Sequence, residues 1–217
     1  MPNWSINHEI ITGPKEEVKH LHHLLTEWTS KNYMENGFGT KWLGNIVKFA
    51  GFNITDEDPV HGFKCRGSIS ESFKLENINE TEAKITFTSE TAWAPMPKMW
   101  YAVLKKFAPH SKYYYFSEEC GMQLYVSNDI DHKFFNDEYI VDTFYDDDTP
   151  EIITKNFPES RYHYSHQDII QGLQNILHTT EEDFDTLYQM LNKKKEKETI
   201  PLCINKIVYE TDEEQVL

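Results

Sequence analysis

The sequence lacks the features of a membrane or secreted protein. No apolar run approaches the roughly 20 residues needed to cross a bilayer. The first residues, MPNWSINHEI, have neither the basic region nor the apolar region of a signal peptide. The three cysteines form no CxxC pair, which argues against both a disulfide framework and a thiolate zinc motif. We therefore expect a soluble cytoplasmic protein.

Positive charge is also scarce. The 217 residues include 21 Lys and Arg against 36 Asp and Glu, a formal net charge of −15. Such a chain repels a phosphate backbone, so we expect no direct binding to nucleic acid. The same charge would suit a protein partner with a basic surface.

Motifs for nucleotide binding and nucleophilic catalysis are missing. The stretch GFGTKW, residues 37–42, has neither the Walker A spacing nor the third glycine of a dinucleotide fingerprint. No GxSxG turn occurs, and Cys120 follows two glutamates whose charge disfavours a thiolate. We predict no catalytic residue, no cofactor and no metal, and the balance favours a protein that is not an enzyme.

Apolar periodicity predicts a mixture of strands and helices. In residues 4–11, Trp4, Ile6 and Ile10 alternate with Ser5, Asn7 and Glu9, which is typical of a strand. The other expected elements are helices at 14–29, near 42–50 and between Pro97 and Pro109, and strands within 72–76, 83–88, 111–119, 122–127 and 138–148. This order predicts a ferredoxin-like α+β fold, an antiparallel sheet with helices packed on one face.

The last third of the sequence predicts a helical extension. Ser165 and Thr180 each stand three residues before an aspartate and ahead of an apolar run, so each is expected to cap a helix. We expect one domain over residues 1–148, with an irregular insertion at about 30–70, and two C-terminal helices within 149–217 that pack on the same domain.

The stretch TSETAWAPMPKMW, residues 88–100, concentrates bulky and stiff residues. A binding platform and a packed structural corner are the two interpretations. Pro95 and Pro97 stop the strand and permit a helix to begin, so Trp93 closes the strand and Trp100 opens the helix. We interpret the stretch as a corner in which both indoles are buried against one sheet.

Four stretches resemble the YubB ferredoxin-like domain family: MPNW at the start, GFGTKW, ITFTSETAWAPMPKMW at 85–100 and YYYFSEECG at 113–121. The resemblance covers about the first 130 residues and implies a ferredoxin-like fold in a bacterial protein of unknown function, commonly encoded on plasmids and other mobile elements. Two positions depart from the family pattern. Leu43 replaces an acidic residue, and Cys120 replaces a proline.

Three groups of residues could bind a metal, and we expect none of them to do so. Glu16, His20, His23 and Glu27 share one helix stripe, but structural sites usually draw ligands from more than one element. His163 and His166 lack the HExxH pattern. Carboxylates gather at Asp142, Asp146, Asp147, Asp148 and Glu151, with a spacing that fits no EF-hand.

Consecutive aromatic residues at 113–116 raise the question of base stacking. On a strand, Tyr113 and Tyr115 share one face, and Tyr114 and Phe116 share the other, so one pair could be exposed. The basic pattern of RNA-recognition strands is absent, and we expect these rings to pack inside the protein.

Two functional hypotheses follow. The first is a non-enzymatic protein-interaction module with an acidic surface. The alternative is a small-ligand-binding protein or enzyme whose pocket lies between the sheet and the 30–70 insertion, near Trp42, Trp93 and Trp100. A homo-oligomer that pairs through a sheet edge or exposed aromatics is a third interpretation.

Overall fold

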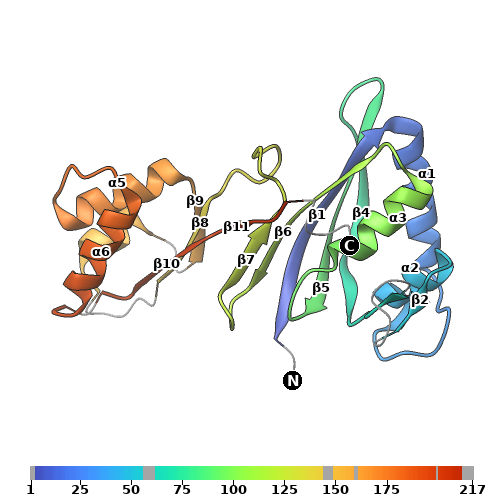
Figure 1. Cartoon of the computed structure of the whole chain (residues 1–217), viewed down its shortest axis with the longest axis horizontal. Helices are drawn as coiled ribbons and strands as arrows, with labels where there is room; N and C mark the ends of the chain where they lie inside the picture. Colours follow the sequence, from blue (N-terminus) through green and yellow to red (C-terminus); the bar gives the residue numbers. More distant parts are fainter. Residues whose placement is uncertain (1–2, 56–61, 144–148, 159–160, 199, 212–217) are drawn as a thin grey trace. The chain divides into compact units, whose positions relative to one another are not determined.

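The protein is described by a computed structural model that covers residues 3–55, 62–143, 149–158, 161–198 and 200–211. The chain forms two compact units, residues 1–131 with 209–217, and residues 132–208 (Figure 1). The expected boundary at 148 differs from this division, because the strand at 139–143 pairs with later strands of the second unit. None of the helices in the described ranges is both long enough and apolar enough to cross a membrane.

The first unit contains a six-stranded sheet. Its strands are β1 (Trp4–Pro14), β4 (Gly67–Asn77), β5 (Glu82–Ala92), β6 (Lys112–Glu119), β7 (Leu124–Ser127) and β11 (Val208–Tyr209), in the order β11–β7–β6–β1–β5–β4. β1 lies between β5 and β6 and is antiparallel to both, while β4 is antiparallel to β5 and β7 to β6. The N-terminal strand is therefore central, and both of its edges are paired.

Three helices pack with this sheet around one apolar core. They are α1 (Lys15–Trp28), α2 (Leu43–Phe49) and α3 (Pro97–Phe107), with a 3-10 turn at Gly39–Lys41 and a short parallel pair, β2 (Asn53–Ile54) and β3 (Gly62–Phe63), in the insertion. The buried side chains are Val18, Leu21, Leu25 and Trp28 on α1, and Met99, Trp100, Val103 and Leu104 on α3. Each helix is thus amphipathic and held by burial of its apolar side.

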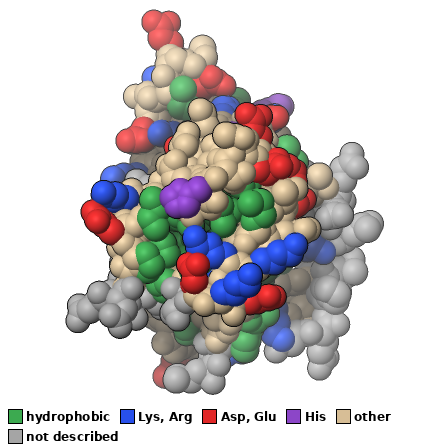
Figure 2. Space-filling model, turned by 90° about the vertical axis from the view of Figure 1, so that its left-hand side faces the viewer, with side chains coloured by type: hydrophobic (Ala, Val, Ile, Leu, Met, Phe, Trp, Pro, Cys, Tyr) green, Lys and Arg blue, Asp and Glu red, His purple; other side chains and the backbone are tan. Residues whose placement is uncertain are grey.

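The second unit has a separate core. Its three-stranded antiparallel sheet, in the order β10 (Leu202–Lys206), β8 (Tyr139–Thr143), β9 (Arg161–Tyr164), packs with α4 (Glu151–Asn156), α5 (His166–Leu177) and α6 (Phe184–Lys195). On the face seen in Figure 2, hydrophobic side chains are interrupted by lysine and carboxylate side chains. Charged side chains therefore lie among the apolar ones on that face.

The two predicted caps of these helices have different outcomes. Ser165 caps α5, because its hydroxyl accepts a hydrogen bond from the Asp168 backbone N–H, as predicted. Thr180 does not cap α6. The cap is Asp183, whose carboxylate accepts from the Thr186 N–H at 2.9 Å. The prediction was wrong because aspartate is itself a strong N-cap residue. The mixed α/β class is confirmed, and the narrower ferredoxin-like assignment stays a proposal.

Gly44 in α2 is required by the position of the Trp42 indole. A Cβ at Gly44 would lie 2.4–2.5 Å from three indole ring atoms, whereas a Cβ at Gly37 would meet nothing within 4 Å. We expect Gly44→Ala to destabilise the first unit by about 1–3 kcal/mol through overpacking, and Gly37→Ala to change its stability by less than about 0.5 kcal/mol. Urea denaturation followed by tryptophan fluorescence measures both. Equal effects of the two variants would contradict this account of Trp42.

Candidate functional site

The helix-facing side of β1 is polar at one end, opposite to the usual pattern. Ser5, Asn7 and Glu9 are almost completely buried, whereas Trp4 and Ile6 are 41% and 39% exposed. The alternation predicted for this strand is correct, but the polar side chains face the interior. Buried polar groups are costly unless they are hydrogen-bonded, so their partners decide what this region does.

Asn7 is the centre of a hydrogen-bond network that crosses three strands. Its Oδ1 accepts from the Ser117 hydroxyl at 2.7 Å, and the Ser5 and Ser117 hydroxyls lie 2.6 Å apart. Its Nδ2 donates to the Thr91 hydroxyl at 2.9 Å and to Ser89 Oγ at 3.1 Å. Thr91 donates in turn to the Ala94 carbonyl at 2.8 Å. The network joins β6, β1 and β5 to the segment that follows β5.

Glu9 lies further along the same strand and is fully buried. Its Oε1 accepts from the Tyr113 hydroxyl at 2.7 Å, and within the described residues its Oε2 has no hydrogen-bond partner. Burial raises the pKa of this carboxyl from 4.5 to about 7, while the nearby side chains of Ser89, Tyr113 and Trp100 pull the pKa down. The same burial and the nearby Glu9 charge raise the pKa of Tyr113 well above its usual value. Glu9 is therefore a titrating group in the interior near neutral pH.

A pocket of about 520 Å³ lies beside the segment that the network holds. We call it the 94–99 pocket, after the residues that form one wall. The opposite wall comes from the insertion and from the returning C-terminal segment. Its lining residues are Thr55, Gly62, Phe63, Lys64, Ala94, Pro95, Met96, Pro97, Lys98, Met99 and Glu210. The size is typical of small-molecule sites, and most of the lining is apolar.

The 94–99 wall is fixed from both ends. Trp93 adopts a left-handed backbone, with φ at 76°, and its N–H donates to the Asn3 carbonyl at 2.9 Å. Thr91 binds the Ala94 carbonyl, and Met99 is buried in the core at the start of α3. Two prolines restrict the backbone between these anchor points. The backbone of this wall is therefore held in place by contacts within the protein.

The opposite wall is anchored by other contacts. Trp42 Nε1 donates to the Cys65 carbonyl at 3.2 Å, and the Ala92 N–H donates to the Arg66 carbonyl at 2.9 Å, which together hold the chain after β3. The Glu210 carboxylate accepts from the Tyr115 hydroxyl, and the Glu210 N–H donates to the Ser127 carbonyl at 2.9 Å. A central-sheet tyrosine thus fixes the only carboxylate among the lining residues described above.

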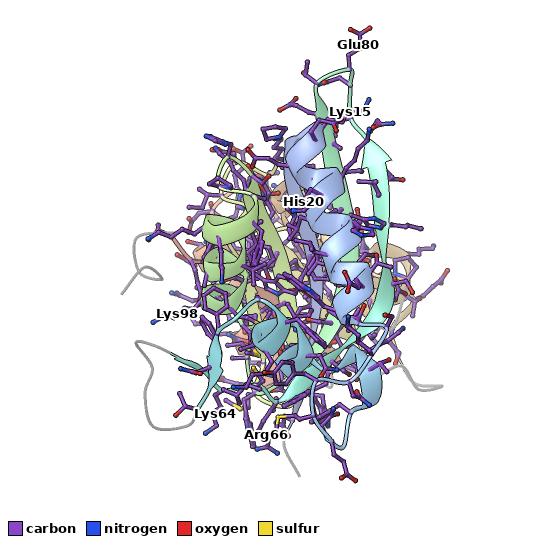
Figure 3. All side chains as sticks on the ribbon, turned by 90° about the vertical axis from the view of Figure 1, so that its right-hand side faces the viewer. Lys15, His20, Lys64, Arg66, Glu80 and Lys98 are labelled. Carbon is purple, nitrogen blue, oxygen red and sulfur yellow. The ribbon has the colours of Figure 1, made fainter. Side chains whose placement is uncertain are left out.

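Charged side chains also line the pocket. Among its described lining residues, Lys64, Lys98 and Glu210 carry charge. Lys64, Arg66 and Lys98 lie in one part of the unit in Figure 3, and Lys15 and Glu80 lie far from them. α3 begins at the pocket with Pro97 in its first turn and without a side-chain cap. The positive end of the helix dipole adds to the lysine charge.

The three tryptophans predicted to mark a pocket have separate locations. Trp42 and Trp100 are buried in the core of the first unit, as the interpretation of a packed corner expects. Trp93 is 45% exposed, so the expected burial of this indole is wrong. Trp93 follows the last residue of β5 and has a left-handed backbone, so it does not continue the alternation of the strand. None of the three lines the 94–99 pocket, although Trp42 and Trp93 position its walls.

The predicted histidine stripe is exposed on α1, where Glu27 pairs with Lys31 at 2.7 Å and Glu16 with Lys19 at 3.4 Å. His163 lies 3.4 Å from Asp137, and His166 lies 3.0 Å from the Tyr139 hydroxyl. Asp146, Asp147 and Asp148 fall outside the described residues, while Asp142 accepts from Asn205 and Glu151 pairs with Lys155. Over the residues with described positions, no group of three or more potential ligands could hold a metal.

Cys120 and the aromatic residues at 113–116 are the remaining candidates from the sequence. Cys120 is exposed and free. Tyr113, Tyr115 and Phe116 are buried and Tyr114 is half-buried, so neither pair of rings forms an open stacking surface.

A larger hollow of about 850 Å³ in the second unit includes Asn156, Gln174 and Asn175 in its lining. Asn175 donates to Asn156, and Gln174 donates to the Glu181 carbonyl, so these polar groups bind within the protein.

Comparison of the chain with protein-family models, with curated proteins and with solved structures finds no match. The function therefore has to be argued from the 94–99 pocket and its surroundings.

Proposed function

We propose that residues 1–131 and 209–217 form a small-ligand-binding domain whose binding site is the 94–99 pocket. The observation that carries this proposal is a cavity of about 520 Å³ with apolar walls and three charged side chains. Such a combination suits a small organic molecule, because apolar walls supply the binding free energy and a few polar groups fix the orientation. The pocket adjoins the 30–70 insertion, whereas none of Trp42, Trp93 and Trp100 lines it.

Because its walls are held in place by the protein, the pocket fits a binding site better than a packing defect. A pocket that is already formed costs little ordering free energy when a ligand enters it. The Asn7 network and Tyr115 bond the lining residues Ala94 and Glu210, and Trp42 bonds Cys65, the neighbour of the lining residue Lys64. Polar side chains that face the core side of β1 are costly, and their link to the pocket wall gives them a function.

Methionine methyl NMR tests this proposal on the full-length protein. Of the six methionines, Met96 and Met99 line the pocket, and Met34, Met122 and Met190 serve as internal controls. With [¹³C-methyl]methionine labelling and a diverse fragment library, we expect some fragments to shift Met96 and Met99 alone. An Ala94→Leu variant, which fills the pocket, should abolish these shifts, and Ala102→Leu on α3 should retain them. A library that never shifts Met96 or Met99 would contradict the proposal.

The ferredoxin-like assignment is proposed for the same unit. It is supported by the order β6–β1–β5–β4, with α1 between β1 and β4 along the chain and α3 between β5 and β6. Two of the YubB-like stretches, residues 85–100 and 113–121, lie mainly on β5, α3 and β6, so we also propose a bacterial cytoplasmic protein of a mobile element. An experimental structure of residues 1–131 in the full chain with another strand order would contradict the assignment.

A protein-interaction surface is the second candidate function. It is supported by the exposed Trp4 and Ile6 on the sheet face away from the helices, where Trp4 also packs edge-on to Phe38 at 6.1 Å. A basic partner would complement the net charge of −15. The test is capture from bacterial lysate by the wild type and by a Trp4→Ser, Ile6→Ser double variant. Capture that is equal for both proteins would argue against this surface, and light scattering of both would reveal self-association.

A further inference from the structure

We propose that the proton on Glu9 controls the position of the 94–99 wall, so that this buried carboxyl group is a pH-sensitive switch in the first unit. The inference adds a mode of regulation to the proposed function of the pocket, and it rests on that function only for its biological meaning. The switch itself belongs to the core of the protein and is tested without a ligand.

Two buried polar atoms on different elements have no hydrogen-bond partner among the described residues. They are Glu9 Oε2 on β1 and Trp100 Nε1 on α3. The Trp100 indole lies close enough to the carboxyl group to lower its pKa. An indole N–H can only donate, and an ionised carboxylate can only accept. Loss of the Glu9 proton therefore creates an acceptor for Trp100, and we expect the indole to move into a hydrogen bond with the charged group.

The surroundings of Glu9 contribute no competing titration near neutral pH. On β6, Tyr113 donates to Glu9 Oε1 at 2.7 Å, and the pKa of Tyr113 lies well above its usual value of 10, so it keeps its proton. On β5, the polar neighbour is Ser89, and α1 contributes only apolar side chains to the core. Tyr101 and Tyr115 act on the pKa of Tyr113. None of the described groups that shift the Glu9 pKa is charged.

A chain of hydrogen bonds connects Glu9 to the 94–99 wall. The Ser89 side chain lowers the Glu9 pKa by hydrogen bonding, and its hydroxyl accepts from Asn7 Nδ2 at 3.1 Å. Asn7 also donates to Thr91 at 2.9 Å, and Thr91 donates to the Ala94 carbonyl at 2.8 Å. Hydrogen bonds in such a network polarise one another. A charge on Glu9 is therefore expected to change the bonds along this chain as far as Ala94.

A second route to the same wall runs through α3. Trp100 directly follows Met99 in this helix, and the fully buried Met99 lines the pocket. A close-packed core transmits small displacements, so movement of the indole toward Glu9 also displaces Met99. Coupling free energies are reciprocal. A ligand in the pocket and the proton on Glu9 are therefore expected to change each other's affinity.

NMR spectroscopy of the ligand-free, full-length protein tests the switch. With [¹⁵N-indole]tryptophan and [¹³C-methyl]methionine labelling, we expect the Trp100 Nε1–H signal to move downfield as the pH rises, with a midpoint near pH 7. The Met96 and Met99 methyl signals should move with the same midpoint. The other tryptophans are internal controls for pH effects that do not come from Glu9: Trp4, Trp28, Trp42 and Trp93.

Three variants assign the transition to Glu9. Glu9→Gln should remove it from Trp100 and from both methionines, because glutamine does not ionise. Tyr113→Phe removes a hydrogen bond that lowers the Glu9 pKa, so the midpoint should move to higher pH. Tyr101→Phe is the matched control, because the Tyr101 hydroxyl accepts from Asn128, and it should keep the midpoint near pH 7.

The outcomes separate this inference from the proposed function. A Trp100 signal that shows no transition, or the same transition in Glu9→Gln, overturns the switch. A Glu9-dependent transition of Trp100 that Met96 and Met99 do not follow overturns the coupling to the wall. Both results leave the ligand-binding function to the fragment screen. If the screen fails while all three signals show the Glu9-dependent transition, the switch stands and the proposed function fails.

Discussion

Replacement of Glu9 by glutamine is expected to remove a pH dependence of stability that the wild-type first unit shows between about pH 4.5 and pH 7. The folded protein binds the Glu9 proton more tightly than the unfolded chain, because burial disfavours the carboxylate. Stability from this group is therefore fully present below pH 4.5 and is lost as the pH rises through the folded pKa of about 7. Glutamine resembles the protonated acid and can still accept from Tyr113.

The size of the effect follows from the two pKa values. A shift from 4.5 to about 7 corresponds to a loss on the order of 3 kcal/mol from pH 4 to pH 8. The unfolding free energy of Glu9→Gln minus that of the wild type should therefore be larger at pH 8 than at pH 4 by that amount. Urea denaturation measures the difference, and all five tryptophans lie within residues 1–131, so their fluorescence reports the first unit.

A matched control separates Glu9 from the other titrating groups. Glu80 lies in the exposed turn between β4 and β5, and Glu80→Gln removes the same charge outside the core. The difference in unfolding free energy between wild type and Glu80→Gln should stay constant between pH 4 and pH 8 within about 0.5 kcal/mol. A difference between wild type and Glu9→Gln that also stays constant over this range would refute the assignment of a raised pKa to Glu9.

Replacement of Asn7 by alanine should cost the first unit about 2–4 kcal/mol, because buried partners of Asn7 lose hydrogen bonds that water cannot replace. Asn7 accepts from Ser117 and donates to Thr91 and Ser89, all buried. Through Thr91 the change reaches the Ala94 carbonyl, so the Met96 and Met99 methyl signals should shift as well. The same urea series with tryptophan fluorescence measures the loss of stability.

The control for Asn7 is Asn77, which is exposed at the end of β4. Asn77→Ala should change the unfolding free energy by less than about 0.5 kcal/mol and should leave the Met96 and Met99 signals in place. A loss below about 1 kcal/mol for Asn7→Ala would mean that the network contributes little. Unchanged methyl signals in Asn7→Ala would mean that it does not support the pocket wall.

The elements could be predicted because their apolar residues repeat with the period of a helix or a strand. Val18, Leu21 and Leu25 define α1, and the strands expected within 72–76 and 83–88 lie within β4 and β5. The short elements α4, β2, β3 and β9 were not predicted, because two to six residues give no measurable period. The cap of α6 was predicted at Thr180 rather than Asp183, because two good capping residues stand close together in the sequence.

The candidate site was only partly accessible from the sequence. Alternation in β1 indicates that the strand has two faces. The usual rule, that the apolar face is buried, predicts the wrong face here, because the polar side chains are the buried ones. Ser5, Asn7 and Glu9 are buried because Ser117, Ser89 and Tyr113 on neighbouring strands supply partners. Those partners lie more than 80 residues away along the chain, and only the sheet register reveals them.

The stretch TSETAWAPMPKMW combines both of its initial interpretations. Trp100 and Met99 are packed as a structural corner, while residues 94–99 form the wall of a pocket. Stiff prolines between two anchored ends explain how one segment does both. The signal in the sequence was the density of Pro and Met residues in this stretch, and the lysines of the pocket gave none, because Lys64 and Lys98 meet only in the fold.

A crystal structure of the full-length protein with 8-bromooctanoate tests the central claim that the 94–99 pocket is a ligand site. Anomalous scattering from bromine locates the end of the alkyl chain. We predict a bromine peak among Phe63, Met96 and Met99. Bromine peaks found only elsewhere, or an empty pocket at a ligand concentration that saturates the protein, would contradict the account.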